Sequence, residues 1–269
     1  MATGSVWPCL PSEAACVTKV GIPVRFDPSA RHAFWWRTKY PTWEESTFQI
    51  FRYFVRPDSV VLDVGGWIGS TSLWLAALAQ KVVVLEPSDA AFEELVQNAA
   101  QNADRRDRLS LLRVALGARR GFVQMTNRGD SADQVGIYDG RQAILSTVWD
   151  LRELLLAFPI LNETSFIKID AEGSERDLVP SMASFLHRTR PTVWLSLHPY
   201  ALTVEEMTGL VALLKEMCPF LYGLRWNITW ALTDFRITGR MVDRMPQVAD
   251  SADDALCLFS PAPRELLAH

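Results

Sequence analysis

The sequence contains no long apolar run and no excess of basic charge. Its 269 residues include 27 lysine and arginine residues against 31 aspartate and glutamate residues, which gives a formal net charge of −4 at pH 7. Proteins that bind nucleic acids usually carry a basic excess, so this charge balance argues against that class. No apolar run approaches the roughly 18 residues that a membrane span needs. We therefore expect neither a nucleic-acid partner nor a membrane partner.

Cysteine is also scarce. The four cysteines, Cys9, Cys16, Cys218 and Cys257, show no CxxC or other ligand spacing. Such scattered cysteines favour free thiols in a reducing compartment over disulfides or metal ligands. The first charged residue is Glu13, so the start of the chain lacks the basic region and long apolar core of a secretory signal. We expect a cytoplasmic protein.

What is present is a globular composition with an alternating pattern. Hydrophobic residues make up 49% of the chain and charged residues 22%. Apolar segments that suit buried strands lie at 60–63, 81–86, 109–116, 165–170 and 191–197, and two more near 222–229 and 255–259. Helices are predicted at 70–79, after Ser88 or Asp89, and from Thr203, which forms a capping box with Glu206. This alternation predicts a doubly wound α/β fold whose mostly parallel sheet has an antiparallel end.

We expect one domain over residues 58–269, preceded by an N-terminal extension over residues 1–57. The extension gathers Trp35, Trp36, Tyr40 and Trp43 within a few residues of one another. This cluster has two interpretations, and both can hold. In one, the aromatic side chains pack onto the sheet as a cover; in the other, they form a lid that lines a ligand pocket.

A glycine-rich segment joins the first predicted strand to its helix. Asp63 precedes Gly65, Gly66 and Gly69, and no triple of glycines has the spacing of a dinucleotide fingerprint. The pattern Asp-x-Gly-x-x-x-Gly is typical of S-adenosylmethionine-dependent methyltransferases. Glycines at such a turn let ligand atoms approach the backbone closely, and the following helix start offers N–H groups to an anion. We therefore expect the loop to bind the methionine carboxylate, with Asp63 facing the ammonium directly or through water.

Glu86 supports the same nucleoside ligand. It ends the second predicted strand, 23 residues after Asp63, where an acid accepts hydrogen bonds from both ribose hydroxyls. The alternative without a ligand is that Asp63 and Glu86 are solvated residues at the ends of their strands. For the adenine we expect a contact at the backbone of Ala115, although a polar loop with Asp130, Ser131 and Asp133 is a second possibility.

A later segment resembles a known family. The run from Ile167 to Asp170 continues into Glu172 and Gly173, and Thr147 to Leu151 precedes it. Together with the segments 114–117 and 190–191, these residues resemble the FkbM-type methyltransferases over roughly 43–199. The resemblance implies a class I methyltransferase fold, Rossmann-like, with seven strands in the order 3-2-1-4-5-7-6. It also implies S-adenosylmethionine as cofactor and O-methylation of a small molecule such as a natural product or a sugar.

Two positions depart from that family pattern. Trp67 stands in the glycine loop where a small or amide residue is more usual, so its contact to the methionine end is expected to differ. Ser196 stands where many members carry a glutamate before the histidine, so no role of that glutamate transfers to this chain.

Three side chains at strand ends are the catalytic candidates. Asp170 and Glu172 follow the fourth strand and His198 follows the fifth, and ligands bind at the carboxyl ends of such strands. His198 is the first candidate for the base, because a neutral imidazole accepts protons near pH 7. Asp170 orients it or acts as the base itself. Structural roles remain open for each, with Glu172 shaping the turn at Gly173.

The same three residues are also metal candidates. Two carboxylates and one imidazole are suitable ligands for a divalent metal that acidifies a hydroxyl, although we do not expect metal dependence.

Two alternative functions remain open. An N-methyltransferase would have the same fold, whereas an NAD-dependent oxidoreductase is disfavoured by the missing fingerprint.

Overall fold

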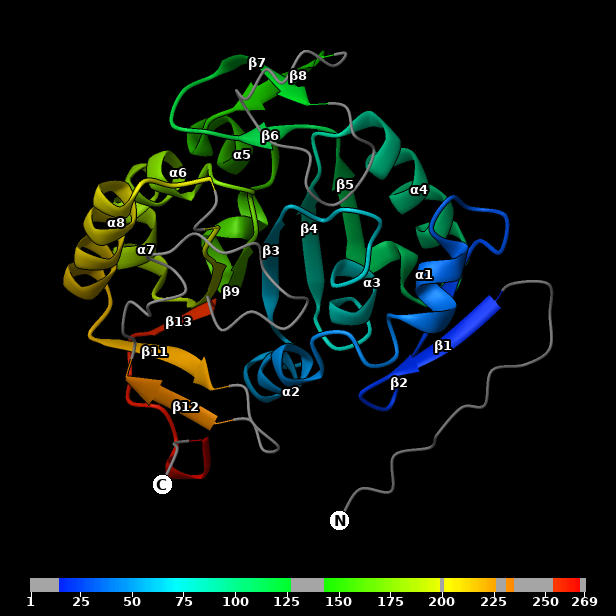
Figure 1. The fold of residues 1–269 in the computed structure, drawn as a ribbon, viewed down its shortest axis with the longest axis horizontal. Coiled ribbons are helices and arrows are strands. Elements are labelled where there is room, and N and C mark those ends of the chain that lie inside the picture. The colour runs from blue at the N-terminus through cyan, green and yellow to red at the C-terminus, as the bar shows by residue number, and fades with distance from the viewer. Residues whose placement is uncertain (1–14, 127–142, 199–200, 226–230, 235–253, 267–269) are drawn as a thin grey trace.

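The computed structural model describes residues 15–126, 143–198, 201–225, 231–234 and 254–266. In this part of the chain the central sheet has the strand order β12-β11-β13-β10-β9-β3-β4-β5 (Figure 1). The strands are β3 (Val60–Val64), β4 (Lys81–Leu85), β5 (Leu109–Leu112), β9 (Thr164–Ile169), β10 (Thr192–Ser196), β11 (Phe220–Arg225), β12 (Ala231–Asp234) and β13 (Asp254–Leu258).

The topology of this sheet confirms the expected order. From β5 to β11 the strands run 3-2-1-4-5-7-6 in their order along the chain, and β12 adds an eighth strand at the edge. The five strands from β10 to β5 are parallel to their neighbours. β13, β11 and β12 pair antiparallel, as the absence of a long helix between the last strands predicted.

In the described ranges, two smaller sheets lie outside the central one. β1 (Ala15–Lys19) and β2 (Ile22–Phe26) form an antiparallel hairpin. β6 (Ala115–Leu116), β7 (Gly121–Thr126) and β8 (Ala143–Trp149) form a three-stranded sheet that Figure 1 shows above the strand ends. The expected third strand at 109–116 is therefore too long. It leaves the central sheet after Leu112, and its last two residues pair with β8 instead.

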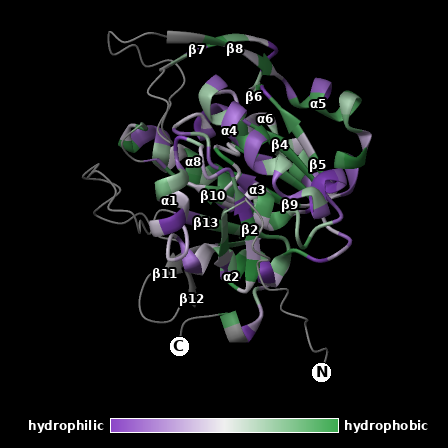
Figure 2. Ribbon diagram, turned by 90° about the vertical axis from the view of Figure 1, so that its right-hand side faces the viewer, coloured by the Kyte–Doolittle hydropathy of each residue, from purple (hydrophilic) through white to green (hydrophobic). Residues whose placement is uncertain are grey.

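Helices cover both faces of the central sheet. One apolar core joins alternate strand residues such as Val61 and Phe166 to α1 (Ala33–Thr38), α2 (Glu45–Phe54), α3 (Ser72–Leu75) and α4 (Asp89–Ala100). The second joins the intervening residues, such as Leu62 and Ile167, to α5 (Leu151–Ala157), α6 (Glu175–Ser181), α7 (Ala183–Thr189) and α8 (Val204–Met217). Among the described residues, short 3-10 helices are η1 (Ala103–Arg108), η2 (Pro159–Glu163) and η3 (Arg264–Leu266). The central strands contribute apolar residues to both clusters, and Figure 2 shows hydrophobic residues along these strands.

Two helix predictions had different outcomes. The capping box at the start of α8 is confirmed, since Thr203 Oγ1 accepts the Glu206 N–H at 3.1 Å and Glu206 Oε2 accepts the Thr203 N–H at 2.7 Å. The helix expected at 70–79 is shorter. α3 ends at Leu75, and the chain continues through i→i+3 turns such as the one from the Leu78 N–H to the Leu75 carbonyl.

The described part of the N-terminal extension packs onto one face of the sheet. Trp36, Tyr40 and Phe51 are fully buried. The Phe51 ring lies 5.2 Å from that of Phe166 and 5.4 Å from that of Trp194, both on central strands. Burying an aromatic side chain of this size contributes about 1.5–3 kcal/mol. The segment is thus part of the core and not a loosely attached arm.

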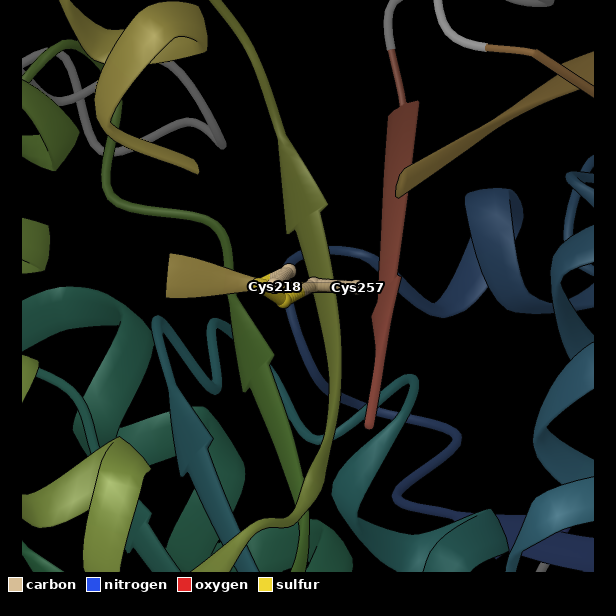
Figure 3. Close-up of a disulfide and its surroundings, with 2 residues drawn as sticks. All are labelled: Cys218 and Cys257. Atoms are coloured by element: carbon tan, nitrogen blue, oxygen red, sulfur yellow. A yellow bond between two sulfur atoms is a disulfide. The ribbon is translucent and has the colours of Figure 1, made fainter. Parts of the chain in front are cut away.

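The structure contains a disulfide that corrects the cysteine prediction. Cys218, at the end of α8, is bonded to Cys257 in β13, with Cα atoms 5.6 Å apart (Figure 3). Free thiols were therefore wrong for this pair, and the described residues include no free cysteine. A separation of 39 residues carries no local signal. The antiparallel pairing of Leu221 with Cys257 brings the two sulfur atoms together. Cys9 lies outside the described residues.

None of the helices in the described ranges has the length and apolar composition needed to cross a membrane.

Candidate active site

A cavity of about 610 Å³ opens at the carboxyl ends of the parallel strands; we call it the strand-end cavity. Its walls come from the loop after β3, from residues 86–88 after β4, from residues 114–119, and from the segment after β9. Parallel α/β sheets bind ligands at this edge. Of the nine predicted catalytic and cofactor-binding residues, five line the cavity: Gly65, Glu86, Ala115, Asp170 and Glu172. Four others lie behind the lining: Asp63, Gly66, Gly69 and His198.

The glycines of the loop are required by the packing of the chain itself. A Cβ on Gly65 would lie 1.9 Å from the carbonyl oxygen of Asp170, and its φ is +82°. A Cβ on Gly69 would lie 2.9 Å from a methyl group of Leu95, with φ +93°. Only glycine adopts such angles without strain. The loop therefore lies directly against the end of β9 and against α4.

The backbone amides of this loop already have acceptors. The N–H groups of Gly65 and Gly66 both donate to the Leu85 carbonyl, at 2.9 and 3.0 Å. The Trp67 N–H donates to Glu86 Oε2 at 2.7 Å. Trp67 itself has φ +44°, which is unusual for a bulky residue. These three N–H groups therefore donate within the chain, and their binding of a ligand carboxylate stays a prediction.

Glu86 is a buried carboxylate that faces the cavity. Besides the Trp67 N–H, it accepts the Ser88 N–H through Oε1 at 2.8 Å. Its residue is 6% exposed, and it lines the cavity. Because a carboxylate oxygen accepts more than one hydrogen bond, these contacts fix the side chain while leaving it suited to accept hydroxyl donors.

Behind the loop lies a buried ion pair. Asp63 and Lys168 stand opposite each other in the pairing of β3 with β9, and Lys168 Nζ lies 3.2 Å from Asp63 Oδ1. The other oxygen of Asp63 accepts the hydroxyls of Thr71 and Ser72 at 3.0 and 2.6 Å. Lys168 also donates to the Gly65 carbonyl at 2.6 Å. Asp63 thus holds Lys168 and the helix start from behind and does not reach the cavity.

The three catalytic candidates lie together. His198 Nε2 is 3.2 Å from Asp170 Oδ1 and 3.7 Å from Glu172 Oε1. The second ring nitrogen, Nδ1, is 2.8 Å from Glu175 Oε1. Lys168 reaches the other oxygen of Asp170 at 3.5 Å. The strand ends therefore bring Asp170, Glu172 and His198 into one cluster, which we call the acid–histidine cluster.

The charges of the cluster set the pKa of His198. Burial by itself would lower the pKa of the imidazole, but Glu175 and Glu172 outweigh this effect and raise it well above the ordinary value. Burial would raise the pKa of Asp170, whereas Lys168 and His198 together lower it. The nearby carboxylates of Asp170, Glu172 and Glu175 therefore favour the protonated form of the His198 ring. This direction differs from the neutral imidazole expected from the sequence, and the role of His198 as a base stays a prediction.

Two charged residues that organise the site received no role from the sequence. Lys168 is 2% exposed, and the Asp63 and Asp170 carboxylates raise its pKa against the lowering effect of burial. Glu175 is fully buried and accepts the N–H groups of Ala171 and Gly173 at 3.0 and 2.9 Å. A signal for Lys168 existed, because a lysine between two isoleucines in a buried strand needs charged partners.

Tryptophans from the extension and from the glycine loop form part of the cavity wall. Trp35, Trp43 and Trp67 line the cavity, and the ring of Trp35 lies 4.8 Å from that of Trp67 and 5.3 Å from that of Trp43. Buried Lys19 holds the segment before α2, donating to the carbonyls of Pro41 and Trp43. The extension thus both covers the sheet and contributes to the cavity. Asp130, Ser131 and Asp133 lie outside the described residues.

Solved structures with a similar fold include methyltransferases. The methyltransferase FkbM from Methylobacillus flagellatus superposes with a TM-score of 0.51 and 17% identity, over 76% of this chain and 44% of that protein. The chain has the class I methyltransferase fold. Because the match spans less than half of the FkbM protein, the similarity concerns the fold alone. No family model and no curated protein matches the chain.

Two other solved structures superpose less closely. An S-adenosylmethionine-dependent O-methyltransferase from Thermotoga maritima has a TM-score of 0.43 and 11% identity, covering 82% of this chain and 66% of that one. An rRNA methylase from Streptococcus thermophilus has a TM-score of 0.46 and 8% identity, covering 80% and 96% of the two chains.

Proposed function

We propose that this protein is an S-adenosylmethionine-dependent methyltransferase that methylates a hydroxyl of a small molecule, such as a natural product or a sugar. The observation that supports this most is the convergence on one cavity. The glycine loop and Glu86 meet there with Asp170 and Glu172, at the strand ends of a class I methyltransferase fold.

In this proposal the cofactor lies across the ends of β3 and β4. Glu86 accepts hydrogen bonds from the ribose hydroxyls, and the segment at Ala115 contacts the adenine. The methionine end lies over Gly65, where a larger residue would collide with Asp170. Asp63 acts through Lys168, which it holds against the loop, because the carboxylate of Asp63 is fully buried behind the cavity lining.

The acceptor binds beside the acid–histidine cluster. Its hydroxyl oxygen attacks the methyl carbon, the C–S bond breaks with its electron pair passing to sulfur, and the hydroxyl proton leaves to a carboxylate of the cluster. Asp170 is ionised and faces the cavity, so it accepts the hydrogen bond that orients the hydroxyl. His198 and Glu172 position Asp170. Correct positioning of the two reactants supplies much of the rate enhancement in such transfers.

Binding of the cofactor is tested by calorimetry with S-adenosylhomocysteine, the demethylated product. We expect binding by the parent chain, and no heat with folded protein would refute the proposal. Thermal stabilisation by NAD instead would favour an oxidoreductase.

The acceptor is tested with a labelled methyl donor and a panel of hydroxyl compounds, amines and RNA, read by mass spectrometry. Label on oxygen of a small molecule supports the proposal, and label on nitrogen or on RNA identifies a different methyltransferase. Alanine at Asp170 or His198 should lower turnover of the identified acceptor at least 10-fold.

The absence of nucleic-acid and membrane partners and a cytoplasmic location are part of the same proposal. The buried Cys218–Cys257 disulfide is an observation against that location, because structural disulfides are uncommon in reducing compartments. Alkylation of the native protein isolated from its own cells, followed by mass spectrometry, distinguishes paired from free thiols.

A further inference from the structure

The acid–histidine cluster has the spacing of a metal site. One ligand atom from each of Asp170, Glu172 and His198 lies within 4.8 Å of the other two. Metal–ligand bonds of about 2.0–2.2 Å place neighbouring ligands of an octahedral ion about 3 Å apart. The separations from His198 Nε2, 3.2 Å to Asp170 and 3.7 Å to Glu172, are close to that value. To complete one face of an octahedron, the oxygens of Asp170 and Glu172, which lie within 4.8 Å of each other, must also approach to about 3 Å.

Buried residues hold two of these side chains from behind. Glu175, fully buried, takes His198 Nδ1 at 2.8 Å and is itself fixed by two backbone N–H groups. This contact directs Nε2 toward the carboxylates. Lys168, 2% exposed, binds Oδ2 of Asp170 and leaves Oδ1 facing the ring. Metal ligands in proteins are oriented in this way by outer hydrogen bonds, most often by a carboxylate on the second nitrogen of a histidine.

The remaining coordination positions would face the ligand cavity. Asp170 and Glu172 line it, whereas His198 closes the cluster from the protein interior. Carboxylates suit Mg²⁺ and Mn²⁺, and an imidazole adds preference for a first-row transition ion. The mixed set of one nitrogen and two oxygen ligands therefore favours a divalent ion such as Mn²⁺, with room for water or an acceptor hydroxyl.

We propose that Asp170, Glu172 and His198 bind one divalent transition-metal ion at the acceptor side of the strand-end cavity. Its catalytic meaning rests on the proposed function: a metal-bound hydroxyl loses its proton more readily and becomes a stronger nucleophile toward the methyl group. Histidine binds a metal ion through an unprotonated ring nitrogen, so His198 would bind as a neutral imidazole. Binding of the ion itself is independent of the acceptor's identity.

The test uses the full chain, stripped with a chelator and titrated with Mn²⁺ while the free ion is followed by electron paramagnetic resonance. We expect one bound ion per chain and a nitrogen coupling from His198 in the pulsed spectrum. Glu172→Gln should weaken binding at least 10-fold, and His198→Ala should also remove the nitrogen coupling. The matched control is Asp177→Asn, in the same cavity wall but 72% exposed and outside the cluster, which should bind Mn²⁺ like the parent.

Each outcome decides the proposal. If Mn²⁺ stays free at millimolar concentration while circular dichroism shows a folded chain, there is no site. If Glu172→Gln and His198→Ala bind the ion like the parent, it lies elsewhere. Calorimetry with S-adenosylhomocysteine in chelator separates this result from the proposed function, because cofactor binding without Mn²⁺ binding would reject the metal site alone. Because Glu172 is partly exposed, its variant remains informative even if His198→Ala fails to fold.

Discussion

Replacing Lys168 with methionine should destabilise the fold strongly, because it leaves Asp63 charged and buried. Asp63 is 0% exposed and Lys168 2%, with their charged groups 3.2 Å apart. Removing one partner of such a pair costs about 3–5 kcal/mol. The hydroxyls of Thr71 and Ser72 still donate to Asp63, so we expect the lower part of that range. For a chain of this length, 3 kcal/mol corresponds to a melting temperature lower by about 6–12 °C.

A double-mutant cycle isolates the pair from simple loss of packing. Chemical unfolding is measured for Lys168→Met, Asp63→Asn and the double variant, without ligand. We expect the double variant to be clearly more stable than the sum of the two single losses predicts, because no unpaired charge of the pair remains. Lys81→Met, which removes a lysine at the start of β4 that donates to the Asp107 carbonyl, is the control and should cost less than about 1 kcal/mol. If Lys168→Met lowered the unfolding free energy by less than about 1 kcal/mol, the argument that Asp63 depends on Lys168 as its buried partner would be refuted.

Four further predictions address the loop, the disulfide and the extension. Gly65→Ala places a methyl group on the Asp170 carbonyl at positive φ, so we expect a loss of at least about 3 kcal/mol and no binding of S-adenosylhomocysteine. Glu86→Gln should raise the dissociation constant of S-adenosylhomocysteine about 10-fold in calorimetry, since one acceptor oxygen is lost. Cys218→Ser opens a 39-residue loop and should lower the unfolding free energy by about 4 kcal/mol in denaturant titration. Burial lowers the pKa of Lys19 from 10.5 to about 8, so the unfolded chain binds more protons between these values. The stability of the parent relative to Lys19→Met should therefore rise from pH 8 to pH 10, and a flat difference would contradict the shift.

Much of the fold could be predicted from the sequence because it depends on local patterns. Continuous apolar runs such as 81–86 predicted buried parallel strands, and the Thr203–Glu206 pair predicted the start of α8. The predictions that were wrong concern features that depend on pairing between distant parts of the chain. Leu112 ends its strand because the chain turns to the three-stranded sheet, and Cys218 meets Cys257 only through the antiparallel end. No local pattern encodes such partners.

The sequence predicted where the site residues lie in the fold, but not which of their side chains face the cavity or contact one another. The rule that parallel strands end at one edge brought Asp170 and His198 together in the prediction, and the structure places them 3.2 Å apart. Which side chains face the cavity depends on their neighbours. Asp63 lies behind the lining because Lys168 stands opposite it on β9. The charge state of His198 depends on Glu175, whose side chain returns from the start of α6.

The chain of charges from Asp63 through Lys168 and Asp170 to His198 and Glu175 also bears on function. A buried ion pair is a weak way to stabilise a fold, because apolar residues of similar size often serve as well. Here the charges join the ends of β3, β9 and β10 to the start of α6, and Lys168 is bonded to both the glycine loop and Asp170. In the proposed function, a shift of the loop on cofactor binding would be passed through Lys168 to Asp170, the carboxylate expected to face the acceptor. This coupling is a reason to retain charges at the strand ends that stability alone does not require.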